Sequence, residues 1–211
     1  MKFLASIFLL FILFAPQTHA AYLTQPSRWL DVYNGYGTNL FENGTWSLVP
    51  KASVEPSETH ASLVLAKYPL SEPYVFRTTM TPVRQLRTGS PPNPWETGWL
   101  LFDYKPDGRF KYLILKPDGY GVEIGEYLGP GEQNFLYTSR VGDLSFPIGQ
   151  SYDVTLVVRS SRIFVFVNGQ EVARYAMSEN DILDTTGRVG LYTEDAEVLF
   201  QDIFAQRLTS R

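Results

Sequence analysis

Hydrophobic and polar residues alternate along much of the chain, and almost no segment shows the 3.6-residue period of a helix. The alternating segments are rich in Val, Ile, Phe and Tyr, as half-buried strands require. Gly, Pro, Asn and Asp separate them and favour turns. The predicted strands are 74–80, 98–104, 109–115, 120–127, 151–158, 162–167, 170–175, 187–193 and 197–208, with further candidates at 45–49 and 61–67. Many short strands at regular spacing predict a β-sandwich or barrel.

Three turn sequences indicate how the central strands pair. Asn168-Gly169 is typical of a type I′ hairpin turn, because both central positions of that turn need a positive φ. Lys-Pro-Asp-Gly occurs at 105–108 and again at 116–119, and each copy suits a three-residue hairpin loop with a bulge at the glycine. These turns predict that Lys105 pairs with Arg109 and that Lys116 pairs with Tyr120.

Counting outward from these turns assigns the side chains of three strands to two faces, since side chains alternate along a strand. The predicted core face carries Leu100, Phe102, Tyr112, Ile114, Val122 and Ile124. The predicted outer face is mixed and carries Trp99, Asp103, Lys111 and Glu123 with three leucines and two glycines. Asp103 and Lys111 would attract each other there. Such a face suits a sugar-binding cleft, although an ordinary outer sheet face has the same composition.

The segments between the strands predict one domain. Residues 87–98 contain three Pro and two Gly and are interpreted as a long loop within that domain. A domain boundary in this loop is the alternative, but the part of the chain before it is short for an independent domain. Residues 178–186 are compatible with one short helical turn.

The first 20 residues have the features of a secretory signal. Lys2 precedes an apolar run over residues 3–14, and Thr18-His19-Ala20 offers small residues where a signal peptidase reads. Twelve apolar residues are too few to span about 30 Å of hydrocarbon. We therefore expect cleavage after Ala20, no membrane span, and a single mature domain over 21–211 that is secreted or periplasmic.

Composition and charge exclude several classes of function. The chain has a net charge of −4 and no basic run, so it is a poor candidate for binding nucleic acid. It contains no Cys, which excludes disulfides and Cys-based zinc sites. His60 is the one histidine after residue 20 and is predicted to be a surface residue rather than a base or a metal ligand. Aromatic residues make up 15% of the chain, which fits a β core, an aromatic sugar-binding surface, or both.

The order of three segments resembles a known superfamily. These are the meander at 97–127, the strand and Val-Asn-Gly hairpin at 151–175, and the closing pair at 187–206. Together they resemble the concanavalin A-like lectin/glucanase superfamily, in the group of laminin-G-like jelly-roll modules. The resemblance covers residues 95–208 clearly and 22–94 weakly, and it implies an all-β fold, a two-sheet antiparallel β-sandwich (jelly roll). Members include lectins, carbohydrate-binding modules, glycoside hydrolases, lyases and protein-binding adhesive modules, so the resemblance implies a fold more than a function.

Ligands in this superfamily usually lie on the concave face of one sheet and in the surrounding loops. Sugar binding needs aromatic rings that stack on C–H faces and polar groups that take hydroxyls. The candidate ligand-binding residues are Arg77, Trp95, Trp99, Asp103, Lys111, Glu123 and Tyr127. Each has a purely structural alternative; Tyr127 could simply cover the sheet edge. Trp29 and Trp46 are predicted to be core residues.

The catalytic motif of the superfamily is not found. Its retaining glucanases carry two Glu flanking an Asp on one face of one strand. The nearest segment here, Glu123-Ile-Gly-Glu126, lacks the Asp, and its two Glu point to opposite faces. An Asp103–Glu123 pair would be separated by about 10 Å, at or beyond the range of inverting glycosidases. We expect glycan or polysaccharide binding without catalysis. The alternatives are a glycoside hydrolase or related sugar-active enzyme and an envelope module with a protein partner.

Modules of this kind often hold a structural Ca²⁺ away from the ligand cleft, through an Asp on the last strand and backbone carbonyls near the first strands. Asp202 matches that strand position and Gly44 is the matching carbonyl donor. Asp202 as a solvated strand residue is the alternative. Asn43-Gly44-Thr45 is also a glycosylation sequon, which matters only if the producing cell glycosylates exported chains.

Overall fold

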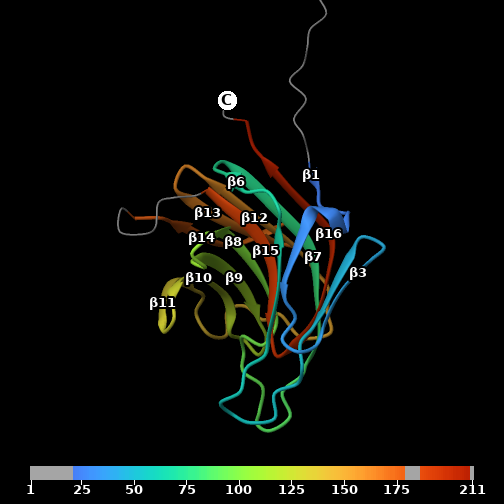
Figure 1. The fold of residues 1–211 in the computed structure, drawn as a ribbon. Coiled ribbons are helices and arrows are strands. Elements are labelled where there is room, and N and C mark those ends of the chain that lie inside the picture. Colours follow the sequence, from blue (N-terminus) through green and yellow to red (C-terminus); the bar gives the residue numbers. More distant parts are fainter. Residues whose placement is uncertain (1–20, 179–185, 210–211) are drawn as a thin grey trace, which may run out of the picture.

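The computed structural model describes residues 21–178 and 186–209, which form two antiparallel sheets that pack face to face (Figure 1). The strands of sheet A are β1 (Ala21–Tyr22), β3 (Thr38–Glu42), β4 (Thr45–Val49), β7 (Tyr74–Gln85), β12 (Tyr152–Arg159), β13 (Arg162–Val167), β14 (Gln170–Ala176) and β16 (Ala196–Arg207). The strands of sheet B are β2 (Trp29–Tyr33), β5 (Ala61–Ala66), β6 (Leu70–Ser71), β8 (Gly98–Tyr104), β9 (Phe110–Lys116), β10 (Gly121–Gly129), β11 (Glu132–Thr138) and β15 (Thr186–Glu194). One 3₁₀ turn, η1 (Pro26–Arg28), precedes β2.

The strand order confirms the predicted two-sheet jelly roll. Sheet A runs β14-β13-β12-β7-β16-β4-β3, with β1 also paired to β16. Sheet B runs β11-β10-β9-β8-β15-β5-β2, with β6 also paired to β15. Because β15 and β16 are consecutive in sequence but lie in different sheets, the chain crosses between the layers at their junction. No helix in the described part of the chain has the length and apolar character that a bilayer crossing requires.

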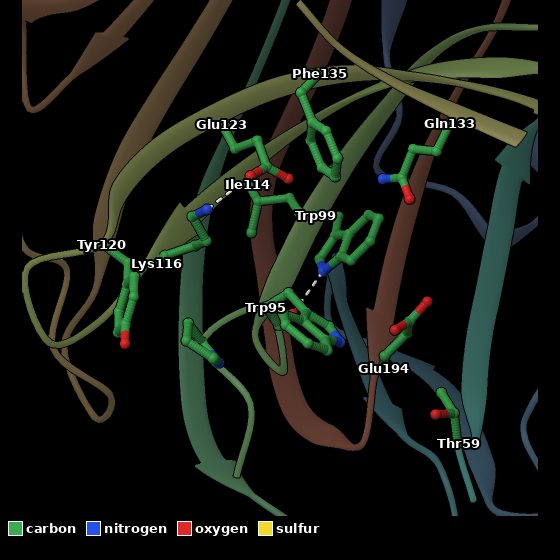
Figure 2. A pocket seen from close by; sticks show the side chains of 11 residues that line it. Thr59, Trp95, Trp99, Ile114, Lys116, Tyr120, Glu123, Gln133, Phe135 and Glu194 are labelled. Atoms are coloured by element: carbon green, nitrogen blue, oxygen red, sulfur yellow. Dashed lines mark hydrogen bonds and ion pairs between the residues drawn. The ribbon is translucent and has the colours of Figure 1, made fainter. Parts of the chain in front are cut away.

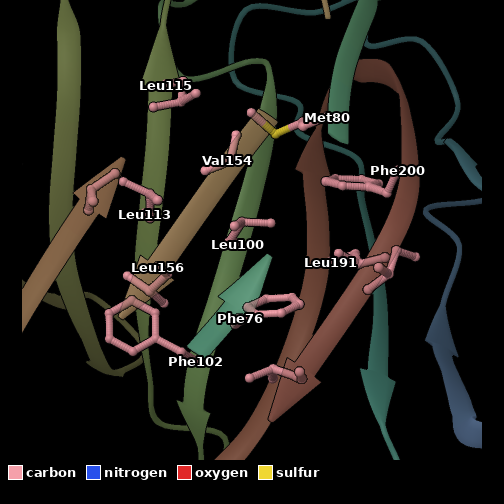
Figure 3. Close-up of a cluster of buried hydrophobic side chains, with 14 of the residues drawn as sticks. Phe76, Met80, Leu100, Phe102, Leu113, Leu115, Val154, Leu156, Leu191 and Phe200 are labelled. Carbon is pink, nitrogen blue, oxygen red and sulfur yellow. The ribbon is translucent and has the colours of Figure 1, made fainter. Parts of the chain in front are cut away.

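The main hydrophobic core lies between the two sheets. Figure 3 shows side chains from both sheets meeting there: Phe76, Met80, Leu100, Phe102, Leu113, Leu115, Val154, Leu156, Leu191 and Phe200. Trp29 and Trp46 belong to this core, as predicted, with ring centroids 6.1 Å apart in an edge-on arrangement. Each buried aliphatic or aromatic side chain contributes roughly 1.5–3 kcal/mol, so no disulfide is needed to hold the layers together.

The predicted register of the central meander was wrong by one residue on both sides of β9. Counted outward from the predicted turns, Leu113 would pair with Leu101 on one side and with Glu123 on the other. In the structure Leu113 pairs with Leu100, and Glu123 pairs with Ile114. A shift of one residue moves every side chain of a strand to the other face. Tyr112 and Ile114 therefore lie on the outer face of sheet B, while Lys111, Leu113 and Leu115 point toward the core between the sheets.

Two backbone features explain this shift. The first Lys-Pro-Asp-Gly turn pairs as predicted, since the Lys105 N–H donates to the Arg109 carbonyl at 2.8 Å. Beyond it, however, Asp103 has a φ of 52° and forms a bulge in β8, so Phe102 and not Asp103 pairs with Lys111. In the second turn, Lys116 pairs with Gly121, which makes the loop one residue longer than predicted. The Asn168-Gly169 turn is a two-residue hairpin with both φ values positive, as predicted.

The long connection between β7 and β8 is a loop, as predicted for residues 87–98, although Gly98 already belongs to β8. Its backbone is anchored to the neighbouring loop because the Thr88 N–H donates to the Ser53 carbonyl at 3.0 Å. The predicted helical turn at 178–186 falls almost entirely outside the described residues, and Thr186 itself begins β15. Five further strands, β1, β2, β3, β6 and β11, were not among the predicted strands.

Candidate functional site

The outer face of sheet B carries a second hydrophobic cluster and two adjoining cavities. The cluster consists of Leu63, Leu65, Trp99, Leu101, Tyr112, Ile114 and Tyr192. Above it lie cavities of about 590 Å³ and about 430 Å³, within the usual range of ligand sites. Both are lined by Trp99, Gln133 and Glu194, so they form one continuous depression, called the groove below.

The larger cavity, the Trp95 cavity, lies between the β7–β8 loop and strand β11 (Figure 2). Trp95 is 43% exposed and Trp99 only 7%, so Trp95 offers an open ring while Trp99 forms the floor. The two are tied together because the Trp99 Nε1–H donates to the Trp95 carbonyl at 2.8 Å. Tyr120 and Phe135, both exposed, also line this cavity and lie well apart from each other in Figure 2. Flat apolar rings around a polar junction are suited to the C–H faces of sugars.

The smaller cavity, the Tyr127 cavity, is lined mainly by tyrosines. Tyr104, Phe110 and Tyr127 form a row of parallel rings, with centroids 5.8 Å apart for the first pair and 5.0 Å for the second. Tyr112 and Tyr192 contact Trp99, each with ring centroids 5.0 Å from it. Their burial raises the pKa of both phenols, so both stay protonated donors at neutral pH.

Tyr112 owes its position to a glycine on the neighbouring strand. Gly125 pairs with Tyr112, and a Cβ at Gly125 would lie 2.1 Å from the Tyr112 hydroxyl oxygen. The phenol therefore lies flat over the backbone of β10, where it accepts from Gln133 and donates to Glu123 at 3.4 Å. The absence of a side chain at Gly125 thus keeps the centre of the groove open.

The charged groups of the groove are one ion pair and one carboxylate. Lys116 Nζ lies 2.7 Å from Glu123 Oε2, so these two charges compensate each other. Glu194 accepts from the Tyr192 hydroxyl at 2.5 Å at the junction of the two cavities. Burial raises the pKa of Glu194, and repulsion by Asp195 and Glu96 raises it further.

A buried ionic network lies directly beneath the Trp95 cavity. The Arg87 Nε–H donates to Glu96 Oε1 at 2.5 Å and its Nη2–H donates to Asp195 Oδ2 at 2.8 Å. The same guanidinium donates to the carbonyls of Glu55 and Glu58 at 3.1 and 2.9 Å. Glu96 also accepts from Asn93 at 2.7 Å, which ties the β7–β8 loop to itself.

His60 belongs to this network, so its prediction as a surface residue was wrong. It is 7% exposed, and its backbone N–H donates to Asp195 Oδ1 at 3.0 Å. The Ser53 hydroxyl donates to the same carboxylate oxygen at 2.5 Å and lies 3.2 Å from His60 Nδ1. Ser53 is fully buried, so this Ser-His-Asp contact presents no nucleophile to a ligand. The network is a structural support, not a hydrolase triad.

Four of the seven predicted ligand-binding residues line the groove. Trp95, Trp99 and Glu123 line the Trp95 cavity, and Tyr127 lines the Tyr127 cavity. Glu123 and Glu126 lie on opposite faces, as predicted, because Glu126 is buried on the core side within 3.9 Å of Lys111.

Asp103 and Lys111 were assigned to the wrong face. The bulge turns Asp103 toward the core, where it accepts from the Tyr74 hydroxyl at 2.8 Å and from Lys111 Nζ at 3.2 Å. Both charged residues are almost fully buried between the sheets. The suggested Asp103–Glu123 pair is therefore separated by sheet B itself. Burial raises the pKa of Asp103, and Lys111 opposes that shift.

Arg77 lies far from the groove, on the exposed outer side of β7 in sheet A. Its guanidinium carbon is 6.0 Å from the centroid of the Phe204 ring. Arg77 lines a small cavity of about 210 Å³ together with Asp202. It therefore cannot contact a ligand held on the outer face of sheet B.

The two predicted calcium ligands lie together. Asp202, with a φ of 49° in a bulge of β16, and Gly44 line a cavity of about 340 Å³. Its other lining residues are Thr24, Asn43, Thr45 and Gln201, which offer hydroxyl and amide oxygens. The donors are hard oxygens, as Ca²⁺ prefers, but only one is charged. No cluster of three His, Cys, Asp or Glu residues suited to a metal occurs within residues 21–178 and 186–209.

Several groove residues were not predicted from the sequence. The unpredicted lining residues are Tyr33, Thr59, Pro94, Tyr104, Gly108, Phe110, Tyr112, Ile114, Lys116, Tyr120, Gln133, Phe135, Tyr192 and Glu194. The glycine–tyrosine contact between β10 and β9 was one available signal, since Gly125 leaves space for one large ring. Gln133 and Phe135 lie on β11, which was not recognised as a strand.

The fold and the groove define a class of structure: the protein is a concanavalin A-like jelly-roll sandwich. It is similar to a carbohydrate-binding module from Bacillus subtilis, with a TM-score of 0.64, 14% identity, and 85% of this chain and 95% of that chain covered. It is also similar to the Bacillus licheniformis beta-glucanase, with a TM-score of 0.57, 10% identity, and 88% and 94% covered. A Bacillus subtilis protein of unknown function with a galectin-like fold matches with a TM-score of 0.53, 12% identity, and 92% and 96% covered. No family model and no curated protein matches the sequence.

Proposed function

We propose that this protein binds carbohydrate in the groove of sheet B and does not hydrolyse it. The observation that carries the proposal is the pair of adjoining cavities lined by open aromatic rings, with Gln133 and Glu194 at their junction. Structures that share the fold include a carbohydrate-binding module and glycosyl hydrolases, which supports a ligand of this class.

The placement of the groove carboxylates favours binding over hydrolysis. Glu123 lies on β10 and Glu194 on β15, and two strands, β9 and β8, separate them. Three strand spacings of about 4.8 Å put their backbones about 14 Å apart, compared with carboxyl separations of about 5–9.5 Å in glycosidases. Figure 2 shows the two side chains on opposite sides of Trp99. Glu123 is also held by Lys116, which compensates the charge a nucleophile or base would use.

Replacement of Trp95 by alanine is expected to weaken glycan binding about tenfold or more, because exposed aromatic anchors carry much of the energy of such sites. Tyr127→Ala should have a similar effect in the second cavity. Binding is measured on a panel of immobilised polysaccharides, and the same panel is assayed for newly released reducing ends. Tyr68→Ala is the matched control, since Tyr68 is exposed and lies outside both cavities.

We expect no sugar release from any polysaccharide that is bound. Release of sugar that is lost in Glu123→Gln or Glu194→Gln would replace the proposal with an enzyme of the same fold. A folded protein that binds no glycan would contradict the proposal, and a co-purifying protein whose binding survives Trp99→Ala would favour the interaction module instead.

We propose further that the protein is exported and that the signal is cut after Ala20. The cut would leave the folded domain whole, because β1 begins at Ala21 and pairs with β16. The absence of cysteine is compatible with either reducing or oxidising surroundings. Whether Asn43, exposed in the turn between β3 and β4, carries a glycan depends on the producing cell.

We propose a structural Ca²⁺ at Asp202 and the carbonyl of Gly44, with the neighbouring hydroxyl and amide oxygens completing the shell. A ligand present at 100 times its dissociation constant increases the free energy of unfolding by about 2.7 kcal/mol. At about 2–4 °C for each kcal/mol, calcium should raise the melting temperature by several degrees over chelator. Asp202→Asn should abolish this shift, whereas Asp143→Asn, at an exposed loop position, should retain it. A melting temperature that is independent of calcium would refute the site.

A further inference from the structure

The charged residues that line the groove are expected to make it bind neutral and anionic ligands differently. Of the described residues lining the two cavities, Lys116 is the single cation, and it is bound to Glu123 at 2.7 Å. Glu194 is the remaining charged residue, and it lines both cavities. The groove therefore offers a ligand one carboxylate and no cation that is not already matched by a carboxylate.

Buried groups behind Glu194 strengthen this asymmetry. Its chain neighbour Asp195 is fully buried, as is Glu96, and both repel negative charge at Glu194. Arg87 attracts it, but that guanidinium already donates to Glu96 and Asp195. Apart from His60, the buried network behind Glu194 holds two carboxylates, Glu96 and Asp195, and one guanidinium, so its carboxylates outnumber its permanent cations. Low exposure limits screening by solvent, so this charge acts on whatever occupies the junction.

Neutral sugars have no such conflict with the groove. Glu194 accepts from Tyr192 through Oε1, and a carboxylate has further acceptor sites for the hydroxyl of a sugar. The phenols of Tyr112 and Tyr192 and the amide of Gln133 add polar groups without net charge. A carboxylate or sulfate on the ligand would instead lie near Glu194 with no free cation to receive it.

We propose that the groove selects uncharged glycan chains that cross the junction of the two cavities, and that Glu194 rejects chains bearing carboxylate or sulfate groups. This inference rests on the proposed carbohydrate binding and specifies which class of glycan the groove binds. Aromatic rings on both sides of Trp99 would hold successive sugars. An anionic substituent would be repelled at the junction of the two cavities, where Glu194 lies.

The test uses matched pairs of polysaccharides that differ only in charge. Neutral glucan, galactan and mannan are each immobilised beside the same chain oxidised to the uronate at carbon 6. For any pair that binds, we expect the neutral member to bind at least about tenfold more tightly, the scale of a like-charge contact in a site of low exposure. High salt should narrow this ratio for the unaltered protein, because it screens the repulsion.

The Glu194→Gln variant tests whether Glu194 causes the preference for neutral over uronate chains. We expect it to narrow the neutral-to-uronate ratio several-fold, because glutamine keeps the shape and the acceptor oxygen but removes the charge. Glu42→Gln, at an exposed position of β3 in the other sheet, is the control and should leave the ratio unchanged.

The outcomes separate this inference from the function on which it rests. Uronate binding equal to or tighter than neutral binding would overturn the charge selection and leave carbohydrate binding intact. A ratio that neither salt nor Glu194→Gln alters would overturn the role of Glu194. Failure to bind any member of any pair would overturn the carbohydrate function and the inference together.

Discussion

Replacement of Arg87 by methionine is expected to lower the free energy of unfolding by about 3–5 kcal/mol, the usual cost of removing one partner from a buried ion pair. Methionine would leave Glu96 and Asp195, both with 0% exposure, without the guanidinium that lies 2.5 and 2.8 Å from them. It would also free the carbonyls of Glu55 and Glu58 from their donor. Urea unfolding followed by tryptophan fluorescence measures the loss.

Arg84 provides a matched control, because it forms an ion pair with Glu197 at a comparable 2.7 Å but its side chain is 67% exposed. Exposed pairs contribute about 0–1 kcal/mol, so Arg84→Met should leave stability almost unchanged. Arg87→Lys should be intermediate, since lysine keeps the charge but cannot donate to four acceptors at once. Equal effects of Arg87→Met and Arg84→Met would show that the network adds no stability.

The Arg87→Met variant should also weaken ligand binding in the groove, because the ionic network and the groove are built from three shared short segments. Thr59, Trp95 and Glu194 line the Trp95 cavity, and each is the chain neighbour of a network residue. Those neighbours come from three places in the chain: His60 directly precedes β5, Glu96 lies in the β7–β8 loop, and Asp195 is the single residue between β15 and β16. The buried charges thus fix the positions of the groove loops, and they connect fold stability to ligand binding.

Local patterns predicted the strands of the core well. The bounds of β4, β8 and β13 match the sequence prediction, because alternation and turn residues mark both ends of these strands. Strand β11 was missed because its residues Glu132–Thr138 are largely exposed at a sheet edge and carry little hydrophobic signal. A strand of this kind is defined by its hydrogen bonds to β10, which the sequence pattern does not reveal.

The candidate site was predicted only in part, for a physical reason that the meander makes clear. The bulge at Asp103 shifts β9 relative to β8 by one residue, and the longer second loop shifts β10 relative to β9 by one further residue. The two shifts add up to two residues between β8 and β10, and because side chains alternate with a period of two, Trp99 and Glu123 still share the predicted face. Strand β9 is shifted by only one residue relative to each neighbour, so Lys111 faces the core and Tyr112 faces the groove, the reverse of the prediction. Non-glycine residues with positive φ are uncommon, so the bulge had no sequence signal.

Replacement of Lys111 by methionine is expected to destabilise the protein by about 3–5 kcal/mol, since it removes a cation that is buried against two buried carboxylates. Lys111 Nζ lies 3.2 Å from Asp103 and 3.9 Å from Glu126, and all three groups are buried between the sheets. Lys67→Met, at an exposed position, should change stability by less than about 0.5 kcal/mol. Denaturant unfolding of both variants measures the difference.

The pH dependence of the Lys111→Met defect gives the sharper test. Burial already raises the pKa of Asp103 above its usual 3.8, and loss of Lys111 removes the stronger of the two charge effects, from Lys111 and Lys105, that oppose this shift. A carboxyl group whose pKa is higher in the folded state takes up its proton more readily there, so lowering the pH from that raised value toward 3.8 favours folding. The deficit of Lys111→Met relative to wild type should therefore shrink as the pH falls. Lys111→Met with Asp103→Asn should recover to within about 2 kcal/mol of wild type at neutral pH, because a neutral replacement for a buried pair is often tolerated. A deficit that is constant with pH and not relieved by Asp103→Asn would mean that Lys111 acts through its packing and not through its charge.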